Sequence, residues 1–351
     1  METSAPLCVI ILAAGKGTRM KSARAKVLHE VFYRPMLHHV LDGVAPLEAD
    51  KTIVIVGHQK EAVASIVEGW GVICCEQREQ KGTGHAVLSA RPLLADFPGT
   101  IMIVNGDAPL LQGEHLQQMI NAHRASAARL TIMTTTLADP TNYGRVISGR
   151  SGAVQAIVEE KDADEQQRAI REINAGIYIA DAGFLFDALA RVTTNNAQGE
   201  MYLTDIVGIG VADGLVINKF EHPYPAHVLG VNSRVELAQA QRELSARRNH
   251  ELLARGVAML DPLTTSIGPG VTIGTGCCLG AAVTILGQST IGDNCVIEPG
   301  VYIDNAQIGN GVKVGANSVV LNRRVDNGVR LAPLSLLDGS ANEQHKNEEQ
   351  P

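Results

Sequence analysis

The chain has 351 residues, of which 45% are hydrophobic and 19% charged, so we expect two domains with sizeable apolar cores and exclude global disorder. Its formal net charge of −7 argues against a general affinity for nucleic acid or for an anionic membrane surface. A local cluster of Lys and Arg can still bind a small anionic substrate in a protein of this charge. The six cysteines include no C-x-x-C pair, so neither a zinc site nor a disulfide framework is predicted.

The first apolar run, Leu7 to Ala14, has no basic segment before it and ends in a Gly-rich turn. These features favour a buried first strand over a signal peptide. No apolar run approaches the length that crosses a bilayer. We therefore expect a cytoplasmic protein that has no membrane and no nucleic acid among its partners.

The N-terminal part alternates apolar runs with amphipathic stretches, which predicts a mostly parallel sheet with helices on both faces. Such sheets bind ligands beyond the carboxyl ends of their strands. The predicted strands are Leu7–Leu12, Thr52–Val56, Val72–Cys75, Ile101–Val104, Leu130–Thr135, Val154–Val158 and Ile173–Ile179. The predicted helices are Met36–Val44, Glu61–Val67, Gly84–Leu93 and Glu114–Ala125.

A polar helix over Ser233–Arg255 is expected to connect this part to a repeat whose period is six residues. The period indicates a parallel β-helix, in which one aliphatic residue of each short strand points inward and glycine relieves the corners. Chance periodicity in a Gly-rich loop is hard to sustain over ten positions. The repeated aliphatic positions are Ile267, Ile273, Leu279, Ile285, Ile291, Ile297, Ile303 and, after one shortened step, Ile308, Val314 and Val320.

The first candidate motif directly follows the first strand. Its glycines let backbone N–H groups approach a phosphate, and its Lys and Arg add positive charge. It is neither a dinucleotide fingerprint nor a Walker A loop, and by itself it is equally consistent with a tight turn carrying solvated cations. Seven residues further on, Lys26 can reach the same phosphates if the loop folds back. The motif runs Leu12-Ala13-Ala14-Gly15-Lys16-Gly17-Thr18-Arg19.

Two further motifs follow. Gln77, together with the turn Gly82-Thr83-Gly84, can read the edge of a base, whereas the neighbouring His85 is favoured as a capping or packing residue. Asp107 follows an apolar strand at the carboxyl edge of the sheet, where a carboxylate can hold Mg²⁺ against a triphosphate. An aspartate that closes a turn before Pro109 is the structural alternative.

Taken together, the motifs resemble N-acetylglucosamine-1-phosphate uridylyltransferase, the first half of a bifunctional enzyme that also acetylates glucosamine-1-phosphate. The resemblance covers about residues 7–262 and continues more loosely into the repeat. It implies a Rossmann-like nucleotidyltransferase domain over residues 1–232, a connecting helix over 233–262 and a short left-handed β-helix over 263–331. Residues 332–351 are expected to form a disordered tail, and a homotrimer is expected from the β-helix. The motifs, in order, are L-A-A-G-K-G-T-R-M, Q-x-x-x-x-G-T-G-H-A, G-D-x-P-L, Y-G-R, V-E-x-K-D, E-I-N-x-G-I, N-N-A-Q-G-E and G-V-N-x-R.

The resemblance also implies roles for individual residues, with UTP and a sugar-1-phosphate as substrates and Mg²⁺ as the cofactor. Asp107 and Asn232 would bind the metal, and Arg19 and Lys26 would hold the triphosphate. The sugar would be held by Asn105, Gly144, Glu159 and Asn174. The uridine would be held by Leu12, Ala13, Ala14, Gly15, Gln77, Gly82 and Thr83.

Three departures from the family pattern stand out. Ala25 replaces the usual Pro before the lysine, which is expected to loosen that loop, and Asn105 replaces a Tyr in the wall of the sugar site. Met201 replaces a Tyr in a milder change. No general base is expected, because a sugar phosphate is already ionised at neutral pH.

Three alternatives remain open at this stage. The same chemistry can act on another pair, such as glucose-1-phosphate with dTTP, or the fold can serve as a non-catalytic assembly subunit. A scaffold, however, has no reason to keep Arg19, Lys26, Asp107 and Asn232 together. The third alternative is a bifunctional enzyme, but acetyltransferase activity is predicted to be absent. No histidine lies between His250 and His345, and the repeats make only about three turns of three hexapeptides.

Overall fold

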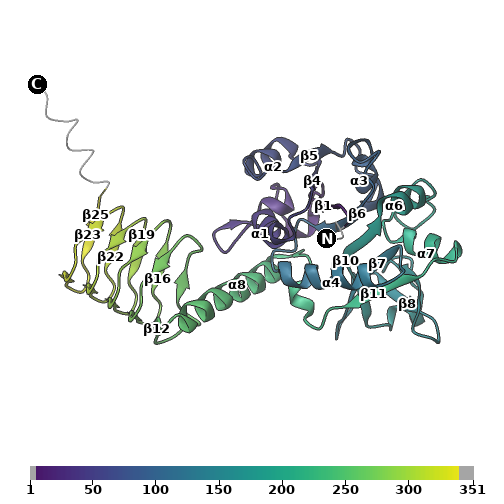
Figure 1. Cartoon of the computed structure of the whole chain (residues 1–351). Coiled ribbons are helices and arrows are strands. Elements are labelled where there is room, and N and C mark those ends of the chain that lie inside the picture. Colours follow the sequence, from purple (N-terminus) through teal and green to yellow (C-terminus); the bar gives the residue numbers. More distant parts are fainter. Residues whose placement is uncertain (1–4, 340–351) are drawn as a thin grey trace, which may run out of the picture. The chain divides into compact units, whose positions relative to one another are not determined.

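The computed structural model describes residues 5–339. The chain divides into two compact units, Met1–Ala240 and Gln241–Pro351, each with its own hydrophobic core (Figure 1). Within the described residues, no helix is long and apolar enough to span a bilayer.

The first unit is built around a nine-stranded sheet whose main order is β11-β7-β10-β6-β1-β4-β5. β1 lies in the interior of this sheet, hydrogen-bonded in parallel to both β4 and β6. The carboxyl ends of β1 and β6 therefore lie side by side at one edge, where a doubly wound sheet binds its ligand. The strands are β1 (Leu7–Leu12), β4 (Lys51–Val56), β5 (Ile73–Glu76), β6 (Thr100–Asn105), β7 (Leu130–Thr136), β8 (Arg145–Ser148), β9 (Val154–Val158), β10 (Glu172–Asp181) and β11 (Ile217–Glu221).

Helices cover both faces of the sheet, so the unit has three layers. The buried residues of α1, α2 and α4 share one core cluster with one face, and those of α3, α6 and α7 share a second cluster with the other. In α1 the apolar residues Leu37, Val40, Leu41 and Val44 recur at helical spacing and are buried. The helices are α1 (Met36–Val44), α2 (Lys60–Ile66), α3 (Thr83–Ser89), α4 (Gly113–Ala125), α5 (Glu165–Arg168), α6 (Ala182–Leu189), α7 (Asp205–Ala212) and α8 (Arg234–Ala254).

Short elements complete the unit. They comprise one two-stranded hairpin, which follows the Gly-rich loop after β1, and five single turns of 3₁₀-helix. Their bounds are β2 (Glu30–Val31), β3 (Arg34–Pro35), η1 (Thr18–Met20), η2 (Lys26–Leu28), η3 (Ala45–Leu47), η4 (Arg91–Leu93) and η5 (Pro225–His227).

The mostly parallel sheet predicted from the sequence is confirmed, with antiparallel pairing around β10. β10 runs antiparallel to its neighbours β6, β7 and β8, and β8 in turn pairs antiparallel with β9. The elements of the first unit that were not predicted are β2, β3, β8, β11, α5, α6 and α7. β11 is a half-exposed edge strand whose Lys219 forms an ion pair with Glu172 across the sheet, so it lacks the apolar run of a central strand. α6 is short and almost wholly apolar, so its periodicity does not distinguish a helix from a strand.

The second unit contains a parallel β-helix made of very short strands stacked in three sheets (Figure 1). Nine of the ten predicted aliphatic positions are buried, and Ile273 is partly buried against the same core. Stacked strands bring these residues into direct register, as at Ile285 and Ile303. The strands are β12 (Ala258–Met259), β13 (Ser266–Ile267), β14 (Thr272–Ile273), β15 (Cys278–Leu279), β16 (Thr284–Leu286), β17 (Thr290–Ile291), β18 (Val296–Ile297), β19 (Tyr302–Asp304), β20 (Gln307–Ile308), β21 (Lys313–Val314), β22 (Val319–Leu321), β23 (Arg324–Val325), β24 (Arg330–Leu331) and β25 (Leu336–Asp338).

The predicted extent of the β-helix, residues 263–331 with about three turns, is too short. Its sheets contain five, five and four strands, from β12 to β25, so residues 332–339 belong to the β-helix and not to a tail. The inward positions continue at Val325, Leu331 and Leu337, where Arg, Asn and Asp neighbours obscure the pattern. The disorder predicted for 340–351 concerns residues outside those described.

Corners of the β-helix are relieved by asparagine as well as by the predicted glycine. Asn305 and Asn317 adopt a φ of +49° and +54°, in the left-handed region that asparagine tolerates best after glycine. The Asn305 side-chain oxygen accepts a hydrogen bond from the Gln288 backbone N–H in the coil before it, at 3.0 Å. Each such bond ties one coil to the next.

Candidate active site

A cleft of about 520 Å³ opens where β1 and β6 end. It gathers every residue predicted to hold the nucleotide, the triphosphate or the metal, together with Asn105 from the sugar set. The lining residues are Leu12, Ala13, Ala14, Gly15, Lys16, Gly17, Arg19, Lys26, Val27, Gln77, Gln80, Gly82, Thr83, Ala86, Asn105, Asp107, Glu200 and Asn232.

The loop after β1 folds back on itself, as the sequence analysis required for its two cations to act together. Gly17 has a φ of +67°, and a Cβ at this position would lie 2.6 Å from the Cβ of Lys26. Only glycine allows this approach. Arg19 and Lys26 are thereby brought to one place, and each donates a hydrogen bond to the same oxygen, Asn232 Oδ1, at 2.9 and 2.7 Å.

Asp107 and Asn232 converge on one cation. The Lys26 ammonium forms an ion pair with the Asp107 carboxylate and also bonds Asn232 Oδ1, and the side chains of Lys26 and Asp107 are each 16% exposed. Asn232 Nδ2 donates to the Gly230 carbonyl at 2.9 Å, which turns its oxygen toward the site. A carboxylate and an amide oxygen are the ligands that Mg²⁺ takes from proteins. This donor set therefore fits Mg²⁺, with the lysine ammonium at present between the two oxygens.

The backbone around Asn232 is held by the start of α8. Ser233 and Glu236 form a reciprocal cap, in which Glu236 N donates to Ser233 Oγ and Ser233 N donates to Glu236 Oε2, both at 3.2 Å. The Asn232 N–H also donates to the Glu236 carboxylate. From the other side, Val231 N donates to the Asp107 carbonyl at 2.8 Å, so the two predicted metal ligands are tied together through the backbone.

Gln77 also lines the cleft and is buried. Its amide nitrogen donates to the Gly82 carbonyl at 3.1 Å and lies 3.2 Å from His85 Nδ1. Gly82 has a φ of +106°, and a Cβ there would lie 2.5 Å from the Met201 carbonyl, so this turn also requires glycine. His85 contacts Gln77 from within α3 but is not part of the cleft lining, in keeping with the supporting role favoured for it.

The remaining predicted sugar residues form a group beside the cleft. Asn174 N donates to the Gly144 carbonyl at 2.9 Å, and a Cβ on Gly144 would lie 3.4 Å from Glu159 Oε2. Gly176, two residues after Asn174, contacts the cleft residue Asn105, because a Cβ on Gly176 would lie 2.3 Å from Asn105 Nδ2. Gly144, Glu159 and Asn174 are thus close to one another, but none of them lines the cleft itself.

Glu159 is the titratable group of this set. Its Oε1 accepts a hydrogen bond from the Thr204 hydroxyl at 3.0 Å. Burial is the largest cause that raises the pKa of Glu159, and the Thr204 bond opposes it. Burial also raises the pKa of Tyr178, whose hydroxyl accepts a bond from Asn174 Nδ2 at 2.5 Å. The set therefore presents both a carboxyl group and amides that can bond a polar, uncharged substrate group.

A buried arginine supports the Gly144 loop. Arg145 is 1% exposed, and its guanidinium forms an ion pair with Glu160 at 2.6 Å while donating to the backbone carbonyls of Tyr143 and Arg168. Burying a guanidinium is costly unless it is paired and hydrogen-bonded. The many bonds of Arg145 therefore explain why the Y-G-R segment is held in one conformation.

Sequence reasoning missed Gln80 and Glu200 as lining residues. Gln80 Nε2 donates to the Ala14 carbonyl at 3.0 Å and so joins the loop after β1 to the segment between β5 and α3. Glu200 is brought in because Met201 N donates to the Lys81 carbonyl at 2.8 Å. The signal for Glu200 was available, since it closes the quoted N-N-A-Q-G-E segment. No local pattern singles out Gln80. Val27 and Ala86 also line the cleft and were not predicted.

The loop expected to be loosened by Ala25 is held by a side chain from elsewhere. The Ala25 N–H, which a proline would lack, donates to Gln59 Oε1 at 2.8 Å. Gln59 Nε2 donates in turn to the Ala23 carbonyl at 3.1 Å. Ala25 is fully buried. The substitution therefore exchanges the stiffness of a proline ring for a tertiary hydrogen bond.

The arrangement suits phosphoryl chemistry on a nucleotide. The cleft is lined by exposed loop backbone, by two cations, by a carboxylate and an amide oxygen that fit a divalent metal, and by the hydrogen-bonding side chain of Gln77. The fold and this cleft define a nucleotidyl transferase. The matching family model is described as "Nucleotidyl transferase" and covers residues 8–223. A second model, "Bacterial transferase hexapeptide (six repeats)", matches residues 288–322.

Relatives along nearly the whole chain carry the name "Bifunctional protein GlmU". The protein of Desulfotalea psychrophila is 48% identical over 320 residues, which are 91% of this chain and 94% of that protein. That of Pelobacter propionicus is 42% identical over 94% of this chain and 72% of its own length. The protein of Shouchella clausii is 44% identical over 93% of this chain and 71% of its own length. The chain belongs to this family of nucleotidyl transferases, and its class is that of a sugar-1-phosphate nucleotidyltransferase, as the motifs predicted.

Proposed function

We propose that this protein transfers uridylate from UTP to N-acetylglucosamine-1-phosphate, forms UDP-N-acetylglucosamine and releases pyrophosphate, with Mg²⁺ as its metal. The observation that carries the proposal is the shared bonding of Asp107 and Asn232 to Lys26 at the carboxyl edge of the sheet. Gln77 and Asn105 line the same cleft as this pair, and Asn105 contacts Gly176, which belongs to the segment of the predicted sugar residue Asn174.

The physical problem of the reaction is to bring a sugar phosphate against the α-phosphate of a more negative triphosphate. Mg²⁺ held by Asp107 and Asn232 would neutralise charge on the phosphates in an in-line transition state. Lys26 would then leave the two oxygens and bond the triphosphate together with Arg19. The exposed backbone at Gly15 would donate N–H bonds to phosphate oxygens.

The sugar side requires orientation and no general base, because the attacking phosphate is already ionised at neutral pH. Glu159, Asn174 and the backbone at Gly144 would hold the N-acetyl sugar and limit its rotation. Holding the attacking group in place lowers the entropic part of the barrier. Asn105, at the border between this group and the cleft, would contact the sugar from the nucleotide side.

A pyrophosphate-release screen that crosses four nucleoside triphosphates with several sugar-1-phosphates tests the proposal. UTP with N-acetylglucosamine-1-phosphate should give the highest kcat/KM. A higher value for dTTP with glucose-1-phosphate would replace the proposed substrates while leaving the class of reaction intact. Release from no combination, by correctly folded protein with Mg²⁺, would favour the assembly-subunit alternative.

We also propose that this chain has no acetyltransferase activity, although its relatives are named bifunctional. Hexapeptide acyltransferases generally use a histidine to take a proton from the attacking amine. The sequence has no histidine between His250 and His345. Incubation with acetyl-CoA and glucosamine-1-phosphate should therefore release no more thiol than a control without enzyme. CoA release well above that control would show that another base serves in its place.

A further inference from the structure

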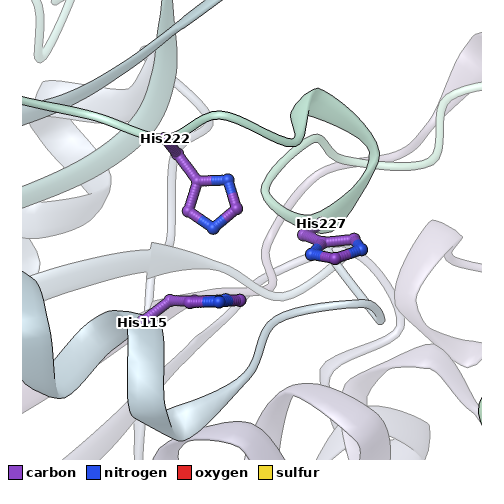
Figure 2. Close-up of side chains that lie close together, drawn as sticks. All are labelled: His115, His222 and His227. Atoms are coloured by element: carbon purple, nitrogen blue, oxygen red, sulfur yellow. The ribbon is translucent and has the colours of Figure 1, made fainter.

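Three histidines gather at a second place in the first unit, apart from the cleft lining. His115 stands in the first turn of α4, His222 directly follows β11, and His227 ends η5. Each offers a ring nitrogen, and these three atoms all lie within 4.8 Å of one another. Figure 2 shows the three rings turned toward a common space, His222 from the strand side, His115 from the helix and His227 from the short turn.

In two of these rings one nitrogen has a polar contact and the other has none. His222 Nδ1 lies 3.0 Å from the Tyr224 carbonyl and 3.1 Å from the Tyr224 backbone nitrogen, while His222 Nε2 is buried and has no hydrogen-bond partner among residues 5–339. His115 Nε2 lies 3.4 Å from the Glu114 carboxylate, while His115 Nδ1 is likewise buried without such a partner. His222 is 2% exposed, so its unpartnered nitrogen is not compensated by bulk water.

This pattern is that of metal-binding histidines, which bond a carboxylate or a carbonyl through the ring nitrogen that does not bind the metal. Ring packing is the structural alternative, since the His115 and His222 centroids lie 4.5 Å apart, edge to face. Packing alone, however, leaves two buried nitrogens without partners.

We propose that His115, His222 and His227 form a binding site for a transition-metal dication of the zinc type, separate from the Mg²⁺ site. Zn²⁺ accepts imidazole nitrogens at about 2.0–2.1 Å in a tetrahedral arrangement, so small side-chain rotations must bring the nitrogens closer together. Three imidazoles favour zinc and its neighbours over Mg²⁺, which prefers oxygen ligands. His115 and His227 are partly exposed, which leaves an entry path and room for water as a fourth ligand.

Such a metal would join the two segments that carry the proposed magnesium ligands. His115 follows Asp107 by eight residues, and His227 precedes Asn232 by five. The anchor is firm, because the His222 N–H donates to the Thr134 carbonyl and its carbonyl accepts from Thr135 Oγ1, both at 2.8 Å. Zinc would therefore cross-link α4 to the segment after β11 and stabilise the folded first unit.

The test uses tag-free, full-length protein that has been treated with a chelator and then dialysed in buffer with millimolar Mg²⁺. Titration with ZnCl₂ in a calorimeter should show about one high-affinity site per chain, and Zn²⁺ should raise Tm. Co²⁺ in place of Zn²⁺ should give the visible absorption bands of a low-symmetry site with nitrogen ligands. Binding of less than half an equivalent, or no change in Tm, would overturn the proposal.

Variants locate the site. Loss of a residue that only supports a ligand typically costs about 10–100-fold in metal affinity. Loss of a ligand itself should cost at least as much, so His222→Gln and the more exposed His115→Gln should each weaken Zn²⁺ binding at least about a hundredfold. His250→Gln, at an exposed position on α8, is the matched control and should bind as the parent does. Asp107→Asn should leave Zn²⁺ affinity unchanged. Parental affinity in both His115→Gln and His222→Gln would refute the site, as would a loss of Zn²⁺ binding in Asp107→Asn.

Discussion

Replacing Asp107 with Asn removes one negative charge from the metal-binding pair while keeping the size and shape of the side chain. The Lys26 ammonium would lose its carboxylate partner but keep its bond to Asn232 Oδ1. A hydrogen bond to a charged group contributes about 1.5–3 kcal/mol. For a domain of this size each kcal/mol corresponds to about 2–4 °C, so Tm should fall by several degrees and the fold should persist.

The effect on turnover should be much larger than the effect on stability. Removing one interaction that stabilises developing charge costs about 10²–10³ in kcat, or about 2.7–4 kcal/mol. We therefore expect Asp107→Asn to lower kcat with UTP and N-acetylglucosamine-1-phosphate at least about a hundredfold. The Mg²⁺ concentration needed for half-maximal rate should also rise, because an amide binds the ion more weakly than a carboxylate does.

The assay is continuous pyrophosphate detection over a range of Mg²⁺ concentrations, with circular dichroism and thermal melts on the same preparations. Asp42→Asn is the matched control, because Asp42 forms a surface ion pair with Arg34 at 2.7 Å and lies outside the cleft lining. It should keep parental kcat. Near-normal kcat for Asp107→Asn at ordinary Mg²⁺ would show that the metal binds elsewhere. An equal loss of kcat in Asp42→Asn would show that the effect does not depend on the position of the carboxylate in the cleft.

Three further predictions concern other parts of the chain. Burial raises the pKa of Glu159, so the folded state loses stability as pH rises above the ordinary glutamate value of about 4.3. Glu159→Gln should therefore have a higher Tm than the parent at pH 7, and this gain should vanish near pH 3.5. The KM of the variant for the sugar phosphate should rise. A gain that does not depend on pH would contradict this assignment. Gln59→Ala leaves the buried Ala25 N–H without its acceptor. The free energy of unfolding from urea titrations should therefore fall by about 1–3 kcal/mol. Gln117→Ala, whose hydrogen bond to Asn121 is exposed on α4, is the control and should change this free energy little. Light scattering should give the mass of three chains, because a short β-helix leaves apolar side faces that association can cover; a monomer mass would refute the trimer.

Local sequence patterns sufficed for the elements whose side chains are buried in a regular alternation or run. β1 and α1 have the predicted bounds. The apolar run of β1 is short and ends in a Gly-rich turn, which favours a strand, and the 3.6-residue period of α1 marks one face of a helix. The β-helix was predictable for the same reason, since each six-residue step returns an aliphatic side chain to one interior. The C-terminal coils of the β-helix were not predicted, because the inward residue is flanked there by charged and polar neighbours.

The position of Asp107 was also readable in advance. A carboxylate directly after a central strand must lie at the edge where parallel sheets bind ligands. The glycines could be interpreted as well, because Gly17 and Gly82 occupy backbone conformations that other residues avoid. The sequence alone therefore determined the fold class of both parts of the chain and placed the Gly-rich loop and Asp107 at the carboxyl edge of the sheet.

Only the tertiary structure decided which distant residues meet. Gln80 bonds the Ala14 carbonyl, and Gln59 replaces the rigidity that a proline at position 25 would supply. His115 and His222 are more than a hundred residues apart in the chain and become neighbours because β11 pairs with β7 beside α4. Such contacts follow from the order and direction of strands in the sheet. That order depends on the packing of whole elements, which no run of neighbouring residues encodes.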